Sequence, residues 1–156
     1  MFMADRIAVM RNGRIVQQGT PVELYCDPAD AFVAAFFGEV NLLKGTVRRG
    51  AVETAIGPIP ARGFSDGAPV SVVIRPEGVK LQAWLDVFEG DPVGHVEESR
   101  LLGRTSLVYM SVNGRSDWSG EPAHLHARVS GLFLPRSGAR VRVAVDMTQT
   151  FVFPDG

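Results

Sequence analysis

Short alternating segments separated by turn residues fill the chain after residue 41 and set its fold class. In RVRVAVDM, Val141, Val143, Val145 and Met147 alternate with other residues, which is the period-two pattern of a strand with one buried face. VSVVIRP shows the same pattern until a proline ends it. Further segments of this kind are KGTVRR, AVETAI, GHVEESRLL, SLVYMSV, LHARVSGLFL and TFVFP. About eight to ten short strands at this spacing predict an all-β region, built as a sandwich or as small barrels.

The beginning of the chain, RIAVMRNGRIVQQGTPVELY, has a different character. Ile7, Val9 and Ile15 belong to two short runs of strand-forming residues. Asn12 and Gly13 separate these runs, and both tolerate the positive φ angles of a type I′ turn. The segment therefore predicts a tight β-hairpin. A second Asn-Gly pair, Asn113-Gly114, predicts another hairpin in the β region.

Two short capped helices are expected after the first hairpin. Thr20, Pro21 and Glu23 fit the N-cap, N1 and N3 positions of a capping box, so a helix begins at Pro21. Asp27-Pro28 interrupts this helix, and Asp27 with Asp30 can cap a second one. The second helix is expected to end at a glycine, residue 38.

Composition limits the classes of function. With 46% hydrophobic residues, the 156-residue chain can hold one or two small domains with real cores. A net charge of −1 gives no basic footprint, and the aromatic residues lie mostly in apolar alternation or in a helix, so nucleic-acid binding is not expected. Cys26 has no partner for an internal disulfide, which fits a reducing cytoplasm, and we expect it to pack in its helix. No apolar run approaches the 20 or so residues of a membrane span, so direct membrane insertion is not expected.

The order of these motifs resembles a known family. MADRIAVMRNGRIVQQGTPVELYCDPADAFVAAFFGEVNLL resembles the C-terminal end of the ATP-binding subunit of ABC importers of the iron(III), polyamine and sugar type. VSVVIRPEGVKL followed by LLGRTSLVYMSV resembles the transport-associated OB (TOBE) module of such subunits. The resemblance implies a mainly β, OB-fold-like TOBE module at 41–156, preceded by the end of a nucleotide-binding domain at 1–40. FFGEVNLL leans towards the iron(III) and polyamine branches.

The residues that bind ATP in this family are missing from the sequence. No G-x-x-x-x-G-K-[ST] loop occurs, and no LSGGQ-like run is found. ATP and Mg²⁺ are therefore expected only in an intact subunit, and no catalytic, cofactor or metal residue is assigned to this chain. The family also implies a cytoplasmic chain held peripherally at the inner membrane through the permease, with a homodimer and the nucleotide-binding domain as further partners.

Two groups of residues are candidates for binding or assembly. Arg75, Pro76 and Glu77 form the RPE step of the module. Arg75 is a candidate anion contact, but a proline ending a strand before Glu-Gly also makes a simple turn, and we favour that structural role. The aromatic residues Phe32, Phe36 and Phe37 lie close together on a helix and form a candidate docking face.

Other candidates bear on ligand binding. A small-ligand sensor is the alternative function, because related OB modules hold an oxyanion such as molybdate. LLGRTSL is its nominated stretch, with Gly103, Arg104, Thr105 and Ser106. Two weaker metal sites, for which a solvated surface is the favoured interpretation, are His124 and His126 with His95, and the acidic group Asp86, Glu89 and Asp91.

Overall fold

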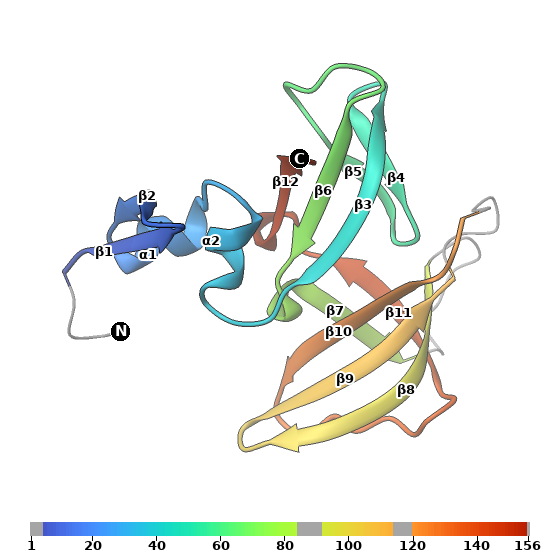
Figure 1. The fold of residues 1–156 in the computed structure, drawn as a ribbon. Coiled ribbons are helices and arrows are strands. Elements are labelled where there is room, and N and C mark those ends of the chain that lie inside the picture. The colour runs from blue at the N-terminus through green and yellow to red at the C-terminus, as the bar shows by residue number, and fades with distance from the viewer. Residues whose placement is uncertain (1–4, 84–91, 114–119, 156) are drawn as a thin grey trace. The chain divides into compact units, whose positions relative to one another are not determined.

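The computed structural model describes residues 5–83, 92–113 and 120–155. These residues fall into two compact units, Met1–Val40 and Asn41–Gly156 (Figure 1). We call the first the N-terminal unit and the second the β module, and we describe each by itself.

The N-terminal unit contains the expected hairpin and two helices. Its elements are β1 (Ile7–Arg11), β2 (Arg14–Gly19), α1 (Pro21–Cys26) and α2 (Ala31–Ala35). The two strands pair antiparallel, and the turn residues Asn12 and Gly13 have φ angles of 52° and 77°. Both angles are positive, so the type I′ turn predicted from Asn-Gly is confirmed.

Side chains fix the two helix starts. The Thr20 Oγ1 accepts from the Glu23 amide at 3.1 Å, and Glu23 Oε2 accepts from the Thr20 amide at 3.0 Å. This reciprocal pair is the predicted capping box. Asp30 caps α2 through its Oδ1, which accepts from the Val33 amide at 2.9 Å. Asp27 ends α1 as its C-cap.

A small core holds the N-terminal unit together. Val9, Leu24 and Val33 are buried, and partly buried apolar side chains pack on them. Helix α2 ends at Ala35, one residue before Phe36, so it is shorter than the sequence predicts. Cys26 is exposed at the last residue of α1, so the expectation that it packs in its helix was wrong.

The β module contains ten strands in its described part, as the sequence pattern predicts. They form two five-stranded antiparallel sheets, ordered β12-β6-β3-β4-β5 and β10-β9-β8-β11-β7 (Figure 1). The strands of the first half are β3 (Asn41–Arg48), β4 (Ala51–Thr54), β5 (Gly57–Pro60), β6 (Pro69–Ile74) and β7 (Val79–Ala83). Those of the second half are β8 (Val93–Leu102), β9 (Thr105–Val112), β10 (Ala123–Ser130), β11 (Arg140–Val145) and β12 (Thr150–Pro154).

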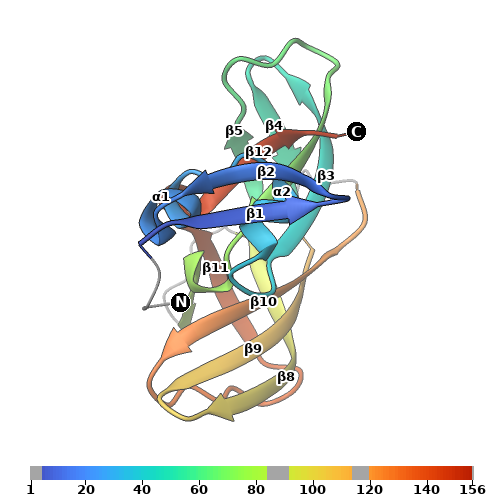
Figure 2. The ribbon, with the colours of Figure 1, turned by 60° about the vertical axis from the view of Figure 1, so that its left-hand side comes forward.

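The two halves repeat one topology and exchange their last strands. Each half consists of four strands, a short 3₁₀ turn and a fifth strand. The turn is η1 (Pro76–Gly78) between β6 and β7 in the first half, and η3 (Met147–Gln149) between β11 and β12 in the second. Each turn carries the chain into the other sheet, so β7 pairs with β11 and β12 pairs with β6. Figure 2 shows the second half from another side, with β10, β9 and β8 next to one another. The repeat includes its turns: the Gly67 and Gly138 amides donate to Val47 and Val96, each at 2.7 Å, with φ angles of 85° and 88°.

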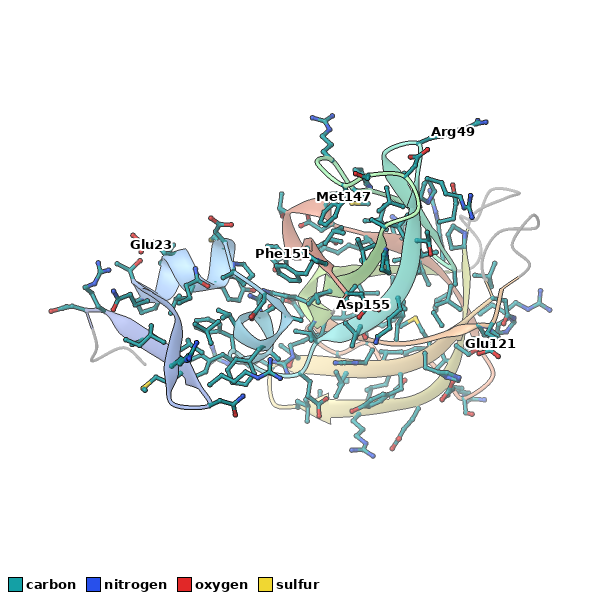
Figure 3. All side chains as sticks on the ribbon, turned by 45° about the horizontal axis from the view of Figure 1, so that its top comes forward. Glu23, Arg49, Glu121, Met147, Phe151 and Asp155 are labelled. Carbon is teal, nitrogen blue, oxygen red and sulfur yellow. The ribbon has the colours of Figure 1, made fainter. Side chains whose placement is uncertain are left out.

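One continuous apolar core spans both sheets. Val70, Val72 and Ile74 of β6 are fully buried, as the alternation predicts. Val73, which points to the other face, is equally buried, so both faces of β6 are covered. The period-two pattern predicted burial of one face only. Met147 is 48% exposed, and its predicted place on the buried face of β11 was wrong because the chain turns into η3 there. Figure 3 shows how densely side chains fill the space between the sheets.

The second Asn-Gly pair does not make the tight hairpin predicted for it. Val112 at the end of β9 pairs with Ala123, so a long connection joins β9 to β10. Gly114 itself lies outside the described residues. The tight turn of this half is Gly103-Arg104, because Leu102 pairs with Thr105.

The helices that the structure describes are all short. Within residues 5–83, 92–113 and 120–155, no helix has the length and apolar character that crossing a membrane requires.

Candidate functional site

The RPE step lies where the two halves of the β module cross. The Arg75 amide donates to the carbonyl of Gln149 in η3 at 3.0 Å, and the Asp146 amide donates to the carbonyl of Gly78 in η1 at 2.8 Å. The two 3₁₀ turns therefore bond to each other reciprocally. A Cβ on Gly78 would collide with the side chain of Gln149, so glycine permits this close approach.

The Arg75 side chain is almost completely buried, at 2% exposure. Its guanidinium carbon lies 5.5 Å from the centre of the Phe151 ring, on β12. Glu77 offers its carbonyl oxygen to Lys80 Nζ at 3.0 Å. These contacts fit the structural role favoured for Arg75, Pro76 and Glu77, since each ties a crossing turn to a neighbouring strand.

The phenylalanines of the candidate docking face have different environments. Phe37 packs on the core of the N-terminal unit and meets Tyr25 edge to face, with ring centres 5.6 Å apart. Phe36 meets Phe37 in the same way at 5.4 Å and is 51% exposed. Phe32 is 39% exposed, with the Arg11 guanidinium 5.1 Å from its ring centre. The exposed aromatic surface is therefore made by Phe32 and Phe36.

The nominated ligand stretch forms the end of the β8–β9 hairpin. Gly103 and Arg104 make its turn, and Thr105 Oγ1 donates to the Leu102 carbonyl at 3.2 Å. The buried Ser106 hydroxyl donates to the Gly131 carbonyl at 2.7 Å and accepts from the Phe133 amide at 2.9 Å. Both hydroxyls of the stretch thus bond within the chain. The two hydrogen bonds of the Ser106 hydroxyl join the segment after β10 to the hairpin.

Replacing Ser106 with alanine should destabilise the β module by about 1 to 3 kcal/mol, because the Gly131 carbonyl and the Phe133 amide lose the buried hydroxyl that they share. Urea denaturation followed by circular dichroism measures the change. Thr105→Ala is the matched control and should cost less, since the hydrogen bond from the Thr105 hydroxyl to the Leu102 carbonyl lies at an exposed site. Equal losses from the two substitutions would contradict the fastening role of Ser106.

The histidines of β10 are engaged with protein groups. His124 Nδ1 lies 2.9 Å from Glu97 Oε1, with both side chains largely exposed. His126 stacks on Tyr109, with ring centres 5.7 Å apart. Among the described residues, no group of three or more His, Cys, Asp or Glu side chains is arranged to hold a metal ion. The acidic group Asp86, Glu89 and Asp91 lies outside the described residues.

Two grooves on the β module were not foreseen from the sequence. One of about 390 Å³ lies between β3 and the start of β10, with Leu42, Lys44, Glu121 and His124 in its lining. The other, about 330 Å³, lies between β7 and the end of β10, with Lys80 and Arg128 in its lining. Both are formed by strands distant in sequence, so no local motif marks them.

Charged side chains on the surface of the module pair locally. Two hydrogen bonds from Arg100, at 2.8 and 3.2 Å, lower the pKa of Glu98, and Glu98 in turn raises the pKa of Arg100. Hydrogen bonds from the hydroxyl and amide of Thr148 lower the pKa of Asp146, which caps η3. A carboxyl group whose pKa is lower in the folded state stabilises that state at pH values above its unfolded-state pKa. This stabilisation is lost as the pH falls towards and through the lowered pKa of the folded state.

Comparison with known proteins gives relatives of one kind. The chain is 36% identical over 143 residues to the Fe(3+) ions import ATP-binding protein FbpC of Pseudomonas fluorescens, covering 92% of this chain and 40% of the relative. It is 31% identical over 158 residues to the sn-glycerol-3-phosphate import ATP-binding protein UgpC of Roseobacter denitrificans, covering 98% and 42%. It is 35% identical over 130 residues to the spermidine/putrescine import ATP-binding protein PotA of Oleidesulfovibrio alaskensis, covering 77% and 34%. No family model matches.

These matches confirm the resemblance seen in the sequence: the homologues of this chain are ATP-binding subunits of ABC importers. The chain spans about a third to two fifths of the length of these curated relatives.

A solved structure supports the fold independently. The cytoplasmic molybdate-binding protein ModG, in a form with molybdate bound, matches 74% of this chain and 96% of its own, with a TM-score of 0.53 and 14% identity. At that identity the likeness concerns the fold alone. The expected OB-fold-like TOBE architecture is therefore confirmed.

Proposed function

We propose that this chain is the C-terminal part of the ATP-binding subunit of an ABC solute importer, with a regulatory and assembly role. Residues 1–40 would be the end of the nucleotide-binding domain, and residues 41–156 the regulatory domain. The observation that carries the proposal is the coverage of 92% and 98% of this chain by two relatives. Matches of that extent run through both units, so hairpin, helices and β module occur together in importer subunits.

The mechanism is binding rather than catalysis. The module contacts its counterpart in the subunit dimer and shifts the balance between the open and closed arrangements of that dimer. ATP and Mg²⁺ bind elsewhere in the intact subunit, because the printed sequence contains no phosphate-binding G-x-x-x-x-G-K-[ST] loop. Phe32 and Phe36 provide a docking face for the rest of the nucleotide-binding domain. The assembly is cytoplasmic and is held at the inner membrane by the permease.

Iron(III) or a polyamine is the proposed cargo. FbpC and PotA, two of the three relatives described, are named for these solutes. UgpC is named for sn-glycerol-3-phosphate, so similarity alone separates the solutes poorly.

Two measurements on the purified chain test the proposal. Sedimentation velocity over a range of concentrations should show a dimer, and an assay for phosphate release should show no ATP hydrolysis above the buffer rate. A strictly monomeric chain would count against the assembly role. Measurable hydrolysis with Mg²⁺ would overturn the non-catalytic assignment.

Oxyanion sensing is the alternative function, and the molybdate-bound ModG fold is the observation that favours it. Thr105 and Ser106 hydroxyls already bond within the chain, which weakens the nominated site. Titration calorimetry with molybdate, tungstate, sulfate and phosphate distinguishes the two functions. Saturable heat with any of these anions would favour the sensor, and its absence in all four would remove it.

A further inference from the structure

The second sheet of the β module curls until its two outer strands, β7 and β10, lie side by side (Figure 1). Within the part of these strands that the structure describes, no backbone ladder joins them: β7 pairs with β11, and β10 pairs with β9. The groove of about 330 Å³ lies between them, and we call it the β7–β10 groove. Its walls are therefore strand edges, which carry rows of backbone N–H and C=O groups.

Hydrogen bonds show which residues of β10 turn their backbone away from β9. The Asn41 side chain bonds to both backbone groups of His126, so the backbone of His126 faces away from β9. Because the direction alternates along an antiparallel strand, the backbone groups of Arg128 and Ser130 face the same way. Both residues line the β7–β10 groove, whereas His124, on the other side of Asn41, lines the other groove.

The opposite wall of the groove also has an open backbone. The Gly78 carbonyl accepts from the Asp146 amide at 2.8 Å, so Gly78 and every second residue after it bond to β11. Leu81 falls between these positions, and its backbone therefore faces away from β11. In residues 5–83, 92–113 and 120–155, neither Leu81 nor Arg128 has a hydrogen-bond partner for these outward groups. Both walls of the groove thus present unpaired backbone groups.

The edges of the first sheet are protected instead. On β5, the residues that face away from β4 are Pro58 and Pro60, which have no N–H. On β12, the outward Thr150 amide donates to the Met147 carbonyl, and the outward Pro154 has no N–H, which leaves a single open amide between them. Sheets commonly block their edges in such ways, so an open edge inside a groove marks a place where another strand binds.

The lining of the β7–β10 groove suits an extended segment with apolar and acidic side chains. Lys80 and Arg128 are exposed cations of this lining, and Glu77 is its one carboxylate. A strand presents alternate side chains to its two sides, so apolar residues meet the floor while acidic residues meet the two cations. The volume, about 330 Å³, lies at the low end of the roughly 300 to 1,000 Å³ of ligand clefts and admits a few residues. The apolar floor is formed by three side chains in or against the core: Val79, Leu81 and Val129.

We propose that the β7–β10 groove binds an extended peptide segment of a partner protein, with alternating apolar and acidic residues, by adding it to the open edge of β10. Arg128 exchanges backbone hydrogen bonds with the segment, and Lys80 and the Arg128 guanidinium face its carboxylates. A second copy of the chain is a poorer occupant, because joining two such edges brings their cations together. The site is separate from the stretch nominated for oxyanions. It goes beyond the proposed function, since it requires neither ATP nor a subunit dimer.

Fluorescence anisotropy of a labelled hexapeptide of alternating valine and aspartate tests the proposal on the whole chain. This peptide should bind saturably at low salt, and a hexapeptide of alternating valine and lysine should bind about tenfold more weakly or worse. N-methylation of all the aspartates or of all the valines should weaken binding about tenfold in one case only, because alternate amides face the edge. Equal binding of the two peptides, or equal effects of the two methylations, would overturn the proposal.

Variants of the chain locate the bound peptide. Arg128→Gln should weaken binding about fivefold through the lost charge. Arg128→Pro should weaken it about tenfold or more, since proline removes the outward N–H and leaves the bonds to β9 in place.

Lys44→Gln is the matched control, because Lys44 lines the groove on the other side of Asn41, and it should leave binding unchanged. Circular dichroism melts check that every variant is folded. A loss from Lys44→Gln equal to that from Arg128→Gln would place the peptide elsewhere and refute the proposal. If no peptide binds and Arg128→Gln instead dissolves a dimer in sedimentation, the edge pairs two copies of the chain.

Discussion

A chain that ends at Gln149 is expected to lose the cooperative unfolding of its β module, although only its last strand is missing. Strand β12 covers the edge of β6, from Thr150 opposite Ile74 to Pro154 opposite Val70. Its removal exposes the β6 ladder and removes Phe153, which is 9% exposed. Losing one such aromatic costs about 3 kcal/mol, and the ladder bonds add to that, against a total stability of about 5 to 15 kcal/mol.

Urea titration followed by circular dichroism measures this loss, and hydrogen exchange locates it. Amides of β6 should gain the most exchange in the truncated chain, because this strand loses its neighbour β12 while β3 keeps both of its own. A chain ending at Pro154 is the control: it removes only the exposed Lys44–Asp155 ion pair, 3.4 Å apart, and one backbone bond to Pro69. It should lose no more than about 1 to 2 kcal/mol. A chain ending at Gln149 that unfolds at the wild-type urea concentration would contradict the strand exchange.

Features encoded by neighbouring residues could be predicted from the sequence. The hairpin at Asn12-Gly13 and the capping box of Thr20 and Glu23 each depend on a few residues, whose backbone preferences act without the rest of the fold. The alternation of Val141 and Val143 likewise reports a strand with one buried face, and both are buried.

Features set by long-range pairing could not be predicted. Asn113-Gly114 has the composition of a tight turn, but Val112 pairs with Ala123, so register overrides local preference. The exchange of β7 and β12 between the sheets depends on which edges are open after the other strands have paired. Local signals in a sequence contain no such information, although the similar strand and turn order in both halves indicates a repeat.

The candidate surfaces divide in the same way. Arg75 was found because it lies in a recognisable step, and its burial against Phe151 explains why an arginine can occupy that position. The two grooves beside β10 were missed because each is lined by strands that are distant in sequence.

Asn41→Leu is expected to destabilise the β module by about 2 to 4 kcal/mol. The Asn41 side chain is 3% exposed, and its Nδ2 donates to the His126 carbonyl at 2.9 Å while its Oδ1 accepts from the His126 amide at 2.8 Å. The Asn41 side chain thus pairs with the backbone of the edge strand β10 as a neighbouring strand would, and it joins the first half of the module to the second. Leucine has the same branched shape but leaves both backbone groups without this partner, at about 1 to 3 kcal/mol each when buried.

Asn41→Asp distinguishes the loss of a hydrogen-bond donor from a change in side-chain shape. Its carboxylate can still accept from the His126 amide but faces the His126 carbonyl without a proton to donate. Aspartate should therefore be destabilising at pH 7 and less so near pH 4, where a protonated carboxyl group can donate, and leucine should show no such recovery relative to wild type. Lys44→Ala, an exposed change on the same strand, should stay within about 1 kcal/mol of wild type, since a surface ion pair contributes little. Urea midpoints at the two pH values decide the matter: equal penalties for aspartate at both would show that Asn41 acts by shape rather than by its two hydrogen bonds.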